Sequence, residues 1–232
     1  MFFDIRYLII ALPALLLAFY AQWKVNSAYN KYSRVPNRRG LTGMDAARAL
    51  LRSAGLEIPV EETPGKLSDH YDPGKNVLRL SQGVSRSPSV AALGIVAHEV
   101  GHALQDATNY GPLRVRSGLV PIVNIGSWLG PIVFIAGFLL SQVTGSTLVA
   151  WIGLFLFAGT VVFALVTLPV ERNASKRALE ILGGYGLADG AELAQTKQVL
   201  DAAALTYVAA LAQSLSTLLY YVFLLTGFSR RD

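Results

Sequence analysis

The sequence contains no cysteine among its 232 residues, which excludes disulfide bonds and any zinc site built from thiolates. It is also poor in charge, because 15% of its residues are Asp, Glu, Lys or Arg, against about 25% in ordinary soluble domains. Histidine occurs only three times, and we find no internal repeat, phosphate-binding loop or low-complexity segment. Apolar residues make up 53% of the chain instead, and this predicts an integral membrane protein.

Four apolar stretches are long enough to cross the hydrocarbon core of a bilayer, which takes roughly 20 helical residues. They run from about Tyr7 to Trp23, Leu119 to Leu140, Leu148 to Leu168 and Leu205 to Phe228. The first lacks a basic leader and a small-residue cleavage site, so we interpret it as a retained anchor rather than a signal peptide. The fourth is the weakest, because its polar side chains would have to face other helices: Gln213, Ser214, Ser216 and Thr217.

Basic residues gather on one side of these stretches. They are Lys24, Lys31, Arg34, Arg38 and Arg39 after the first stretch, Arg114 and Arg116 before the second, and Arg172, Lys176 and Arg177 after the third. The positive-inside rule places that side in the cytoplasm, with the N-terminus and the turn at residues 141–147 outside. Arg230 and Arg231 oppose this orientation if the fourth stretch crosses fully. Because the charges flank apolar stretches and form no aromatic-studded basic stripe, no nucleic-acid partner is expected.

The segment His98-Glu99-Val100-Gly101-His102 carries the clearest chemical signal. On a helix, positions i and i+4 share a face, so both imidazoles can reach one Zn²⁺ ion while Glu99 stands beside it. Catalytic zinc takes three protein ligands and a water whose pKa falls to roughly 7. Glu99 can accept the proton of this water and pass it to the leaving amine. The pattern therefore predicts a zinc metallopeptidase; two surface histidines on an ordinary helix are the alternative.

The residues before the motif support a helix. Ser87 is expected as its N-cap and Pro88 as its first residue, followed by an apolar run to Ala97. This run is too short to span a bilayer, so we expect the helix to pack in a protein core or against the membrane surface.

A third zinc ligand has two candidates, His70 and Glu171. We favour Glu171, which starts an amphipathic segment with Ala174, Ala178 and Ile181 on its buried side. The second and third apolar stretches form a hairpin, which returns the chain to the side on which the motif lies. The alternative for Glu171 is a first-turn carboxylate that complements a helix dipole.

Two further side chains could stabilise an oxyanion. His70 is either such a group or a turn histidine bonded to Asp69 or Asp72. Tyr207 could donate its phenol to an oxyanion, although aromatic residues at this depth usually anchor a helix in the membrane interface.

The remaining polar segments contain helix and strand signals. A helix is predicted from Leu41 to Gly55, capped by Thr42 with Asp45, and a capping box at residues 189–192 starts a helix that runs into the fourth apolar stretch. Short strands are predicted at residues 58–60 and 77–80, with turn residues at 73–76. Such strands can bind an extended peptide through their edge.

Several segments together resemble the YugP-type family of bacterial membrane zinc metallopeptidases. They are Leu67 to Pro73, Ala91 to Gln105, Pro169 to Glu171 and Leu205 to Ala210. The resemblance implies a bacterial inner-membrane protein with a gluzincin-like site, in which His98, His102 and Glu171 bind zinc and Glu99 is catalytic. Asn173 and Ser175 stand where many relatives of the glutamate type have an aspartate that orients a zinc histidine, so the sequence leaves the outer shell of the site undefined.

The sequence thus predicts a mainly α-helical, four-span integral membrane protein with a small α+β zincin-like unit on its cytoplasmic face. The expected parts are an anchor at 1–23, the unit with the motif helix at 24–117, a transmembrane hairpin at 118–168, helices with the third ligand at 169–204, and a transmembrane helix with its tail at 205–232. Peptides or membrane proteins are the expected substrates. The alternative function is that of a membrane scaffold or partner-binding subunit, with a structural metal or with none. The sequence leaves open whether the protein binds a protein partner or forms a homo-oligomer.

Overall fold

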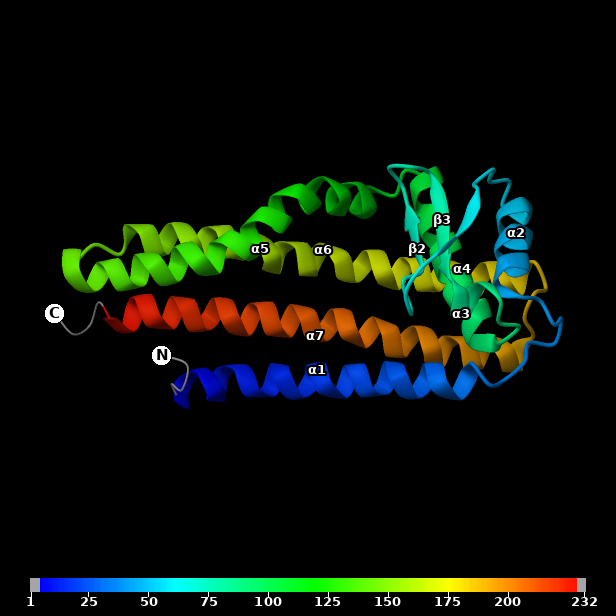
Figure 1. Ribbon diagram of the computed structural model, residues 1–232, viewed down its shortest axis with the longest axis horizontal. Coiled ribbons are helices and arrows are strands. Elements are labelled where there is room, and N and C mark those ends of the chain that lie inside the picture. Colours follow the sequence, from blue (N-terminus) through cyan, green and yellow to red (C-terminus); the bar gives the residue numbers. More distant parts are fainter. Residues whose placement is uncertain (1–4, 229–232) are drawn as a thin grey trace. The chain divides into compact units, whose positions relative to one another are not determined.

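A computed structural model describes residues 5–228 (Figure 1). The chain forms two compact units. The sheet unit consists of Ala21–Leu113 and Pro169–Leu205, and the apolar unit contains the residues up to Tyr20, Arg114–Leu168 and the residues from Thr206.

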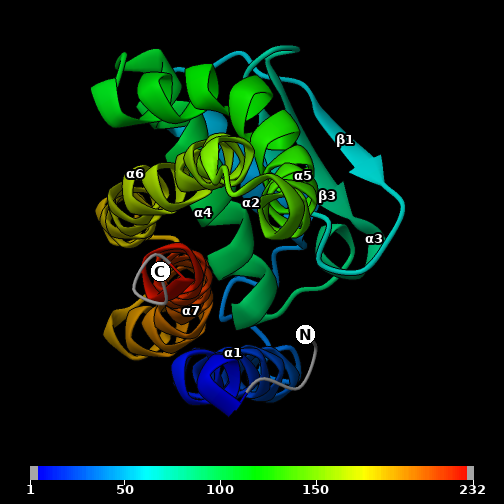
Figure 2. The ribbon, with the colours of Figure 1, turned by 90° about the vertical axis from the view of Figure 1, so that its left-hand side faces the viewer.

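The sheet unit contains three short strands: β1 (Val60–Thr63), β2 (His70–Asp72) and β3 (Val77–Ser81). Their order is β1-β3-β2, with β1 parallel and β2 antiparallel to the central β3, as Figure 2 shows for β1 and β3. Tyr71 is paired with Leu78 in the β2–β3 register. Every residue of β3 except Arg79 is buried, because β3 lies in the centre of the sheet and packs against helices.

Helices complete this unit: α2 (Gly43–Ser53), α3 (Gln82–Ser85), α4 (Val90–Ala107), the end of α1 (Ile5–Tyr32), the end of α6 (Leu148–Gly184) and the start of α7 (Gly190–Phe228). Its core joins side chains of α2, β3, α4 and α6, including Leu50, Leu78, Leu93, Val100 and Leu182, all at most 1% exposed. The predicted packing of the motif helix in a protein core is therefore confirmed.

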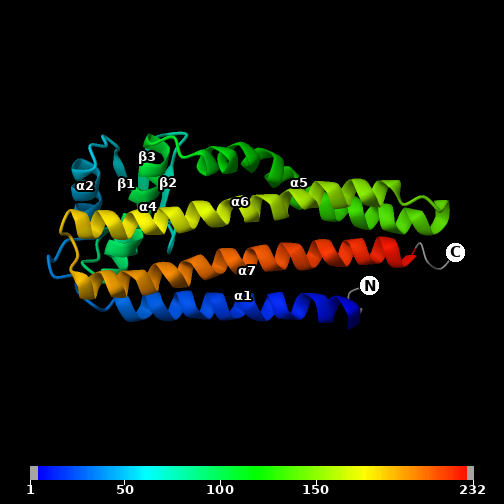
Figure 3. The same cartoon turned by 180° about the vertical axis from the view of Figure 1, so that it is seen from behind.

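The apolar unit is built from α1, α5 (Gly111–Thr144), α6 and α7. All four helices are long and apolar enough to cross a membrane, so the four predicted apolar stretches lie in four candidate membrane-spanning helices. Helix α7 continues unbroken through the weak fourth stretch, while Arg230 and Arg231 lie outside the described residues. Figure 3 shows α5 and α6 joined as a hairpin. A Cβ atom on Gly137 or Gly153 would collide with the facing backbone, so these glycines allow α5 and α6 to approach closely.

Two predicted caps are confirmed. The side chain of Thr42 accepts a hydrogen bond from the Asp45 backbone at the start of α2. At the start of α7, Asp189 Oδ1 accepts from Glu192 N at 2.9 Å and Glu192 Oε2 accepts from Asp189 N at 3.2 Å, which is a complete capping box.

The predicted start of the motif helix is wrong by two residues. Its N-cap is Ser89, whose side chain accepts from Ala92 N, and the helix begins at Val90. The chain before it is held extended, because Val90 N donates to Val35 O and the Pro88 carbonyl accepts from Asn37 N. Pro88 therefore lies in an extended segment rather than in the first turn.

Two other expectations need correction. Helix α6 is continuous from Leu148 to Gly184, so Glu171 lies in its interior and not in the first turn of a separate helix. The alternative interpretation of Glu171 as a first-turn carboxylate is therefore also wrong. Residues 70–72 form a strand, whereas the sequence predicted only a segment next to a turn, and β1 begins at Val60 without Ile58.

Candidate metal centre

One face of α4 carries four residues of the candidate site. His98 lies three and four positions before Gly101 and His102, and Gln105 lies four and three positions after them, which places all four on one side of a helix. The two imidazole rings lie with their centroids 4.8 Å apart and nearly perpendicular. Their side chains are 15% and 11% exposed, so both are largely shielded from water.

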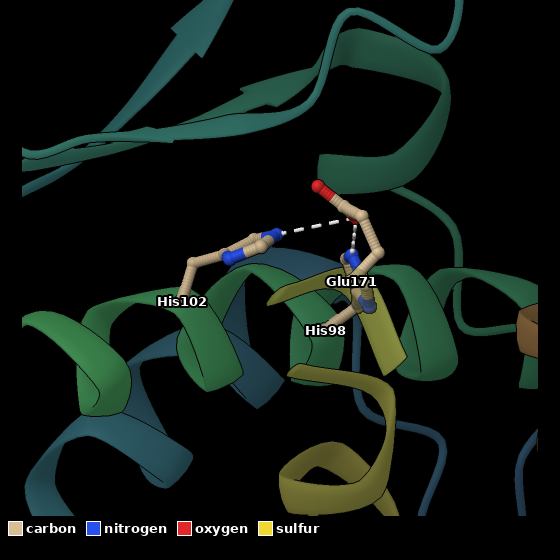
Figure 4. A group of neighbouring side chains, drawn as sticks. All are labelled: His98, His102 and Glu171. Carbon is tan, nitrogen blue, oxygen red and sulfur yellow. Dashed lines mark hydrogen bonds and ion pairs between the residues drawn. The ribbon is translucent and has the colours of Figure 1, made fainter. Parts of the chain in front are cut away.

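Glu171 approaches this face from α6. Its side chain is 2% exposed, and its Oε2 lies 3.1 Å from His98 Nε2 and 3.5 Å from His102 Nε2 (Figure 4). A Cβ atom on Gly101 would lie 2.5 Å from the Ala174 carbonyl oxygen, so the glycine lets the two helices approach closely enough for these contacts. The structure thus brings together the three residues that the sequence proposed as ligands.

The donor atoms fit a tetrahedral metal ion. All three ligand atoms lie within 4.8 Å of one another. Around zinc, with bonds of about 2.0–2.1 Å, neighbouring ligand atoms of a tetrahedron lie roughly 3.3–3.4 Å apart, which is close to the two separations between Glu171 Oε2 and the histidine nitrogens. Two imidazole nitrogens and one carboxylate oxygen also form a donor set that catalytic zinc sites use.

Each histidine has a polar contact at Nδ1, the ring nitrogen that does not face Glu171. His98 Nδ1 lies 3.2 Å from Ser175 Oγ, and His102 Nδ1 lies 2.9 Å from Gln105 Oε1. Since an amide oxygen only accepts, His102 Nδ1 carries the hydrogen, and Nε2 is the atom that it presents toward Glu171. Contacts of this kind fix the orientation and tautomer of metal-binding histidines.

Gln105 is the residue that sequence reasoning missed. It is fully buried, and its Nε2 donates to Val170 O at 2.8 Å and to Asn173 Oδ1 at 2.9 Å. Arg177 Nε donates to the same Asn173 oxygen at 2.9 Å. The outer shell that the sequence left undefined is therefore built from amides, a serine and an arginine. The available signal was a glutamine three residues after His102 in an apolar helix.

The buried charges influence one another strongly. Burial alone would raise the pKa of Glu171, but hydrogen bonds from His102 and His98 outweigh burial and hold it well below its usual range. Burial alone would lower the pKa of His102, but its contacts with Glu171 and the charge of Glu99 raise it. Burial also raises the pKa of Glu99, against the opposing charges of the two histidines.

Glu99 is anchored by the sheet. Its Oε2 accepts a hydrogen bond from the backbone N–H of Tyr71 on β2 at 3.0 Å. The Tyr71 hydroxyl donates to Asp106 Oδ2, 2.9 Å away near the end of α4. Strand β2 is therefore attached to the motif helix at two points, and one of them is the predicted catalytic carboxylate.

The other two predicted site residues lie elsewhere. His70 on β2 is exposed and stands outside the group formed by His98, His102 and Glu171; its Nδ1 is hydrogen-bonded to Ser68 O at 2.8 Å. Tyr207 lies on α7 in the apolar unit and is half-buried.

Comparison with known proteins agrees with the resemblance seen in the sequence. Residues 7–226 match the family described as "Putative neutral zinc metallopeptidase". The chain is 44% identical over 217 residues to the protein named "Putative membrane protease YugP" of Bacillus subtilis (strain 168), covering 93% of this chain and 95% of that protein. No solved structure gives a significant match. Because the family match includes every element that builds the candidate site, the chain belongs to the neutral zinc metallopeptidase family.

Proposed function

We propose that this protein is a membrane-bound zinc endopeptidase in which His98, His102 and Glu171 hold Zn²⁺. The observation that carries the proposal is the convergence of two Nε2 atoms on one buried carboxylate oxygen at 3.1 and 3.5 Å. When bound there, zinc would supply a Lewis acid that polarises the scissile carbonyl and acidifies a water molecule. The site is gluzincin-like in its ligands, because the third ligand is a glutamate from a later helix.

Glu99 carries the proton in this proposal. It accepts a proton from the attacking water and returns it to the leaving amine, so one carboxyl group serves as base and then as acid. Its raised pKa brings the carboxyl closer to the pH at which both transfers are efficient. The Tyr71 N–H holds the carboxylate in place without protonating it, because a peptide N–H donates a hydrogen bond but is too weak an acid to give up its proton.

Strand β2 is the part of the sheet best placed to bind substrate. It pairs with β3 on one side only, and the Tyr71 N–H, which donates to Glu99, belongs to its other edge. An extended peptide that added to this edge would run past the catalytic carboxylate. Because the Tyr71 N–H is already bonded to Glu99, the peptide would be held by the remaining main-chain groups of the edge, which require little sequence preference. The oxyanion roles of His70 and Tyr207 stay predictions, which a loss of cleavage with unchanged bound zinc in His70→Ala or Tyr207→Phe would support.

Membrane proteins, or proteins near the membrane, are the proposed substrates. Glu171 follows the end of the third apolar stretch by only three residues, which supports a site close to the lipid surface. The basic residues flanking the spans support a site facing the cytoplasm of a bacterial inner membrane. Equal cleavage rates for soluble and lipid-tethered copies of one peptide would contradict the preference for membrane or membrane-near substrates.

The membrane orientation can be tested cleanly because the chain has no cysteine. Single cysteines at Ser146, in the turn after α5, and at Lys75, in the sheet unit, should react differently with an impermeant thiol reagent added to intact cells. We expect labelling at Ser146 only. Labelling at Lys75 alone would place the sheet unit outside.

Glu99→Gln is the test of the catalytic proposal. The amide keeps the size of the side chain and can still accept from Tyr71, but it cannot take a proton. We expect cleavage of fluorogenic casein to fall by a factor of about 10²–10⁴, the usual contribution of general acid–base catalysis, while bound zinc stays unchanged. Glu57→Gln, at an exposed position of the same unit, is the matched control. Undiminished casein cleavage in Glu99→Gln would contradict the catalytic role of Glu99. No cleavage by the zinc-loaded wild type would favour a scaffold function.

A further inference from the structure

A cavity of about 360 Å³ lies between α1 and α7 within the sheet unit. Trp23, Lys24, Lys31 and Tyr32 line it from α1, and Gln198 and Asp201 line it from α7. None of these residues belongs to the candidate metal centre. The cavity therefore needs an explanation of its own.

Two lysines make the cavity basic. Lys24 and Lys31 are seven residues apart, which places both ammonium groups on one face of α1, roughly 10 Å apart along its axis. Asp201 is the acidic group in the lining, and it is paired with Lys197 at 2.5 Å on the same helix. The cavity and its margin thus carry three ammonium groups and one carboxylate, so the local charge favours an anion.

The inner wall of the cavity is well packed. Tyr32 is 3% exposed, and its hydroxyl donates to Gln198 Oε1 at 2.7 Å, which joins α1 to α7. The Tyr32 ring packs in a buried cluster with Ala91 of the motif helix α4 and Val199 of α7. Lys31 Nζ lies 4.8 Å from the centre of this ring. A ligand here would meet a preformed surface, so little ordering free energy would oppose binding.

The position along α1 points to a lipid. Trp23 ends the first apolar stretch and is 64% exposed, and Lys24 follows it directly. Tryptophan is enriched at the level of lipid headgroups, and basic pockets between helices at that level bind anionic headgroups. We propose that this cavity binds the phosphate of an anionic phospholipid, with Lys24 and Lys31 as its cationic contacts and Trp23 alongside the upper part of the acyl chains.

Fluorescence quenching of Trp23 by brominated lipids tests the proposal on the full chain. Trp128→Phe and Trp151→Phe leave Trp23 as the only tryptophan. The protein is reconstituted in phosphatidylcholine vesicles that contain increasing fractions of brominated phosphatidylglycerol or, in parallel, brominated phosphatidylcholine. At about 1 kcal/mol per lysine near an anionic surface, two lysines should make the relative binding constant for phosphatidylglycerol roughly 30-fold higher.

Charge variants separate the cavity from the general surface charge. Lys24→Gln with Lys31→Gln should abolish the selectivity, whereas Lys75→Gln with Lys176→Gln, which removes the same charge from exposed positions elsewhere in the unit, should retain it. Native mass spectrometry of the two double variants, counting retained phosphatidylglycerol, gives a second readout that does not depend on the tryptophan replacements.

Three results would overturn the inference. Equal quenching by the two brominated lipids would show that the cavity does not select anionic headgroups. Equal loss of selectivity in both double variants would show that the selectivity for phosphatidylglycerol arises from net charge alone. Displacement of the brominated lipid by millimolar glycerol phosphate at constant ionic strength would identify a site for a soluble phosphate instead.

Discussion

Replacing Gln105 by Met should weaken zinc binding without abolishing it. Methionine has nearly the volume of glutamine, so the buried space stays filled, but the three hydrogen bonds of the amide disappear. His102 Nδ1 and the Val170 carbonyl lose their Gln105 partner, whereas Asn173 keeps its bond from Arg177. The change therefore removes the hydrogen-bond partner of His102 Nδ1 and leaves all three metal-binding atoms in place.

The magnitude follows from these lost contacts. Removing an outer-shell partner of a metal-binding histidine typically costs 10–100-fold in affinity, or about 1.4–2.7 kcal/mol of binding free energy. Each buried polar group left unpaired costs about 1–3 kcal/mol of folding stability in addition. Ser175→Ala should have a smaller effect on affinity, because the Ser175 to His98 contact is longer, 3.2 Å against 2.9 Å.

The assay is competition for zinc between the purified protein and a chromophoric chelator, with chemical unfolding of the metal-free protein measured separately. Gln82→Met, at an exposed position on α3, is the matched control. Wild-type zinc affinity in Gln105→Met would refute the reasoning, since packing of α4 alone would then orient His102. A complete loss of zinc together with a loss of native circular dichroism would instead mean that the network holds the fold.

Three other perturbations test neighbouring parts of the site. Gly101→Ala should cost about 1–3 kcal/mol of stability through overpacking and weaken zinc binding, because its Cβ would meet the Ala174 carbonyl at 2.5 Å; unchanged affinity by chelator competition would contradict this. Tyr71→Phe should speed hydrogen exchange in β2 but leave kcat nearly unchanged, since the bond to Glu99 comes from the backbone; a large fall in kcat would show that the phenol acts in the reaction. In the metal-free protein, protonated His102 stabilises the fold at pH values below the unfolded-state pKa of about 6.5, because folding raises the pKa of His102. This stabilisation should be lost as pH rises through the pKa of His102 in the folded protein, while the affinity for zinc should rise. Unfolding experiments and chelator titrations between about pH 6 and about pH 8 measure the stability and the zinc affinity.

Patterns that depend on neighbouring residues were predictable from the sequence. The four apolar stretches lie in the four long helices, and the caps at Thr42 and at Asp189 with Glu192 form as expected. Each of these features is determined within one or two helical turns. The common face of His98 and His102 follows in the same way from helical periodicity alone.

Features set by distant residues were not predictable. Ser89 rather than Ser87 caps α4, because Val35 and Asn37, some fifty residues earlier, hold the intervening chain extended. Strand β2 has only three residues and gains its partner from β3, so its own sequence gives little signal. The role of Gln105 depends on Val170 and Asn173, more than sixty residues away, and a single sequence cannot display that proximity.

The motif and its partner helix also show why spacing alone does not make a site. His98 and His102 would share a face on any helix, but their Nε2 atoms reach Glu171 only because α4 and α6 approach closely at Gly101 and Ala174. Gly101, directly before the second histidine, is therefore a packing position, where a side chain would separate the helices and move the Glu171 carboxylate away. The two histidines of the motif supply two donor atoms, and Gly101, one of the two residues that the motif leaves unspecified, determines whether Glu171 can supply the third.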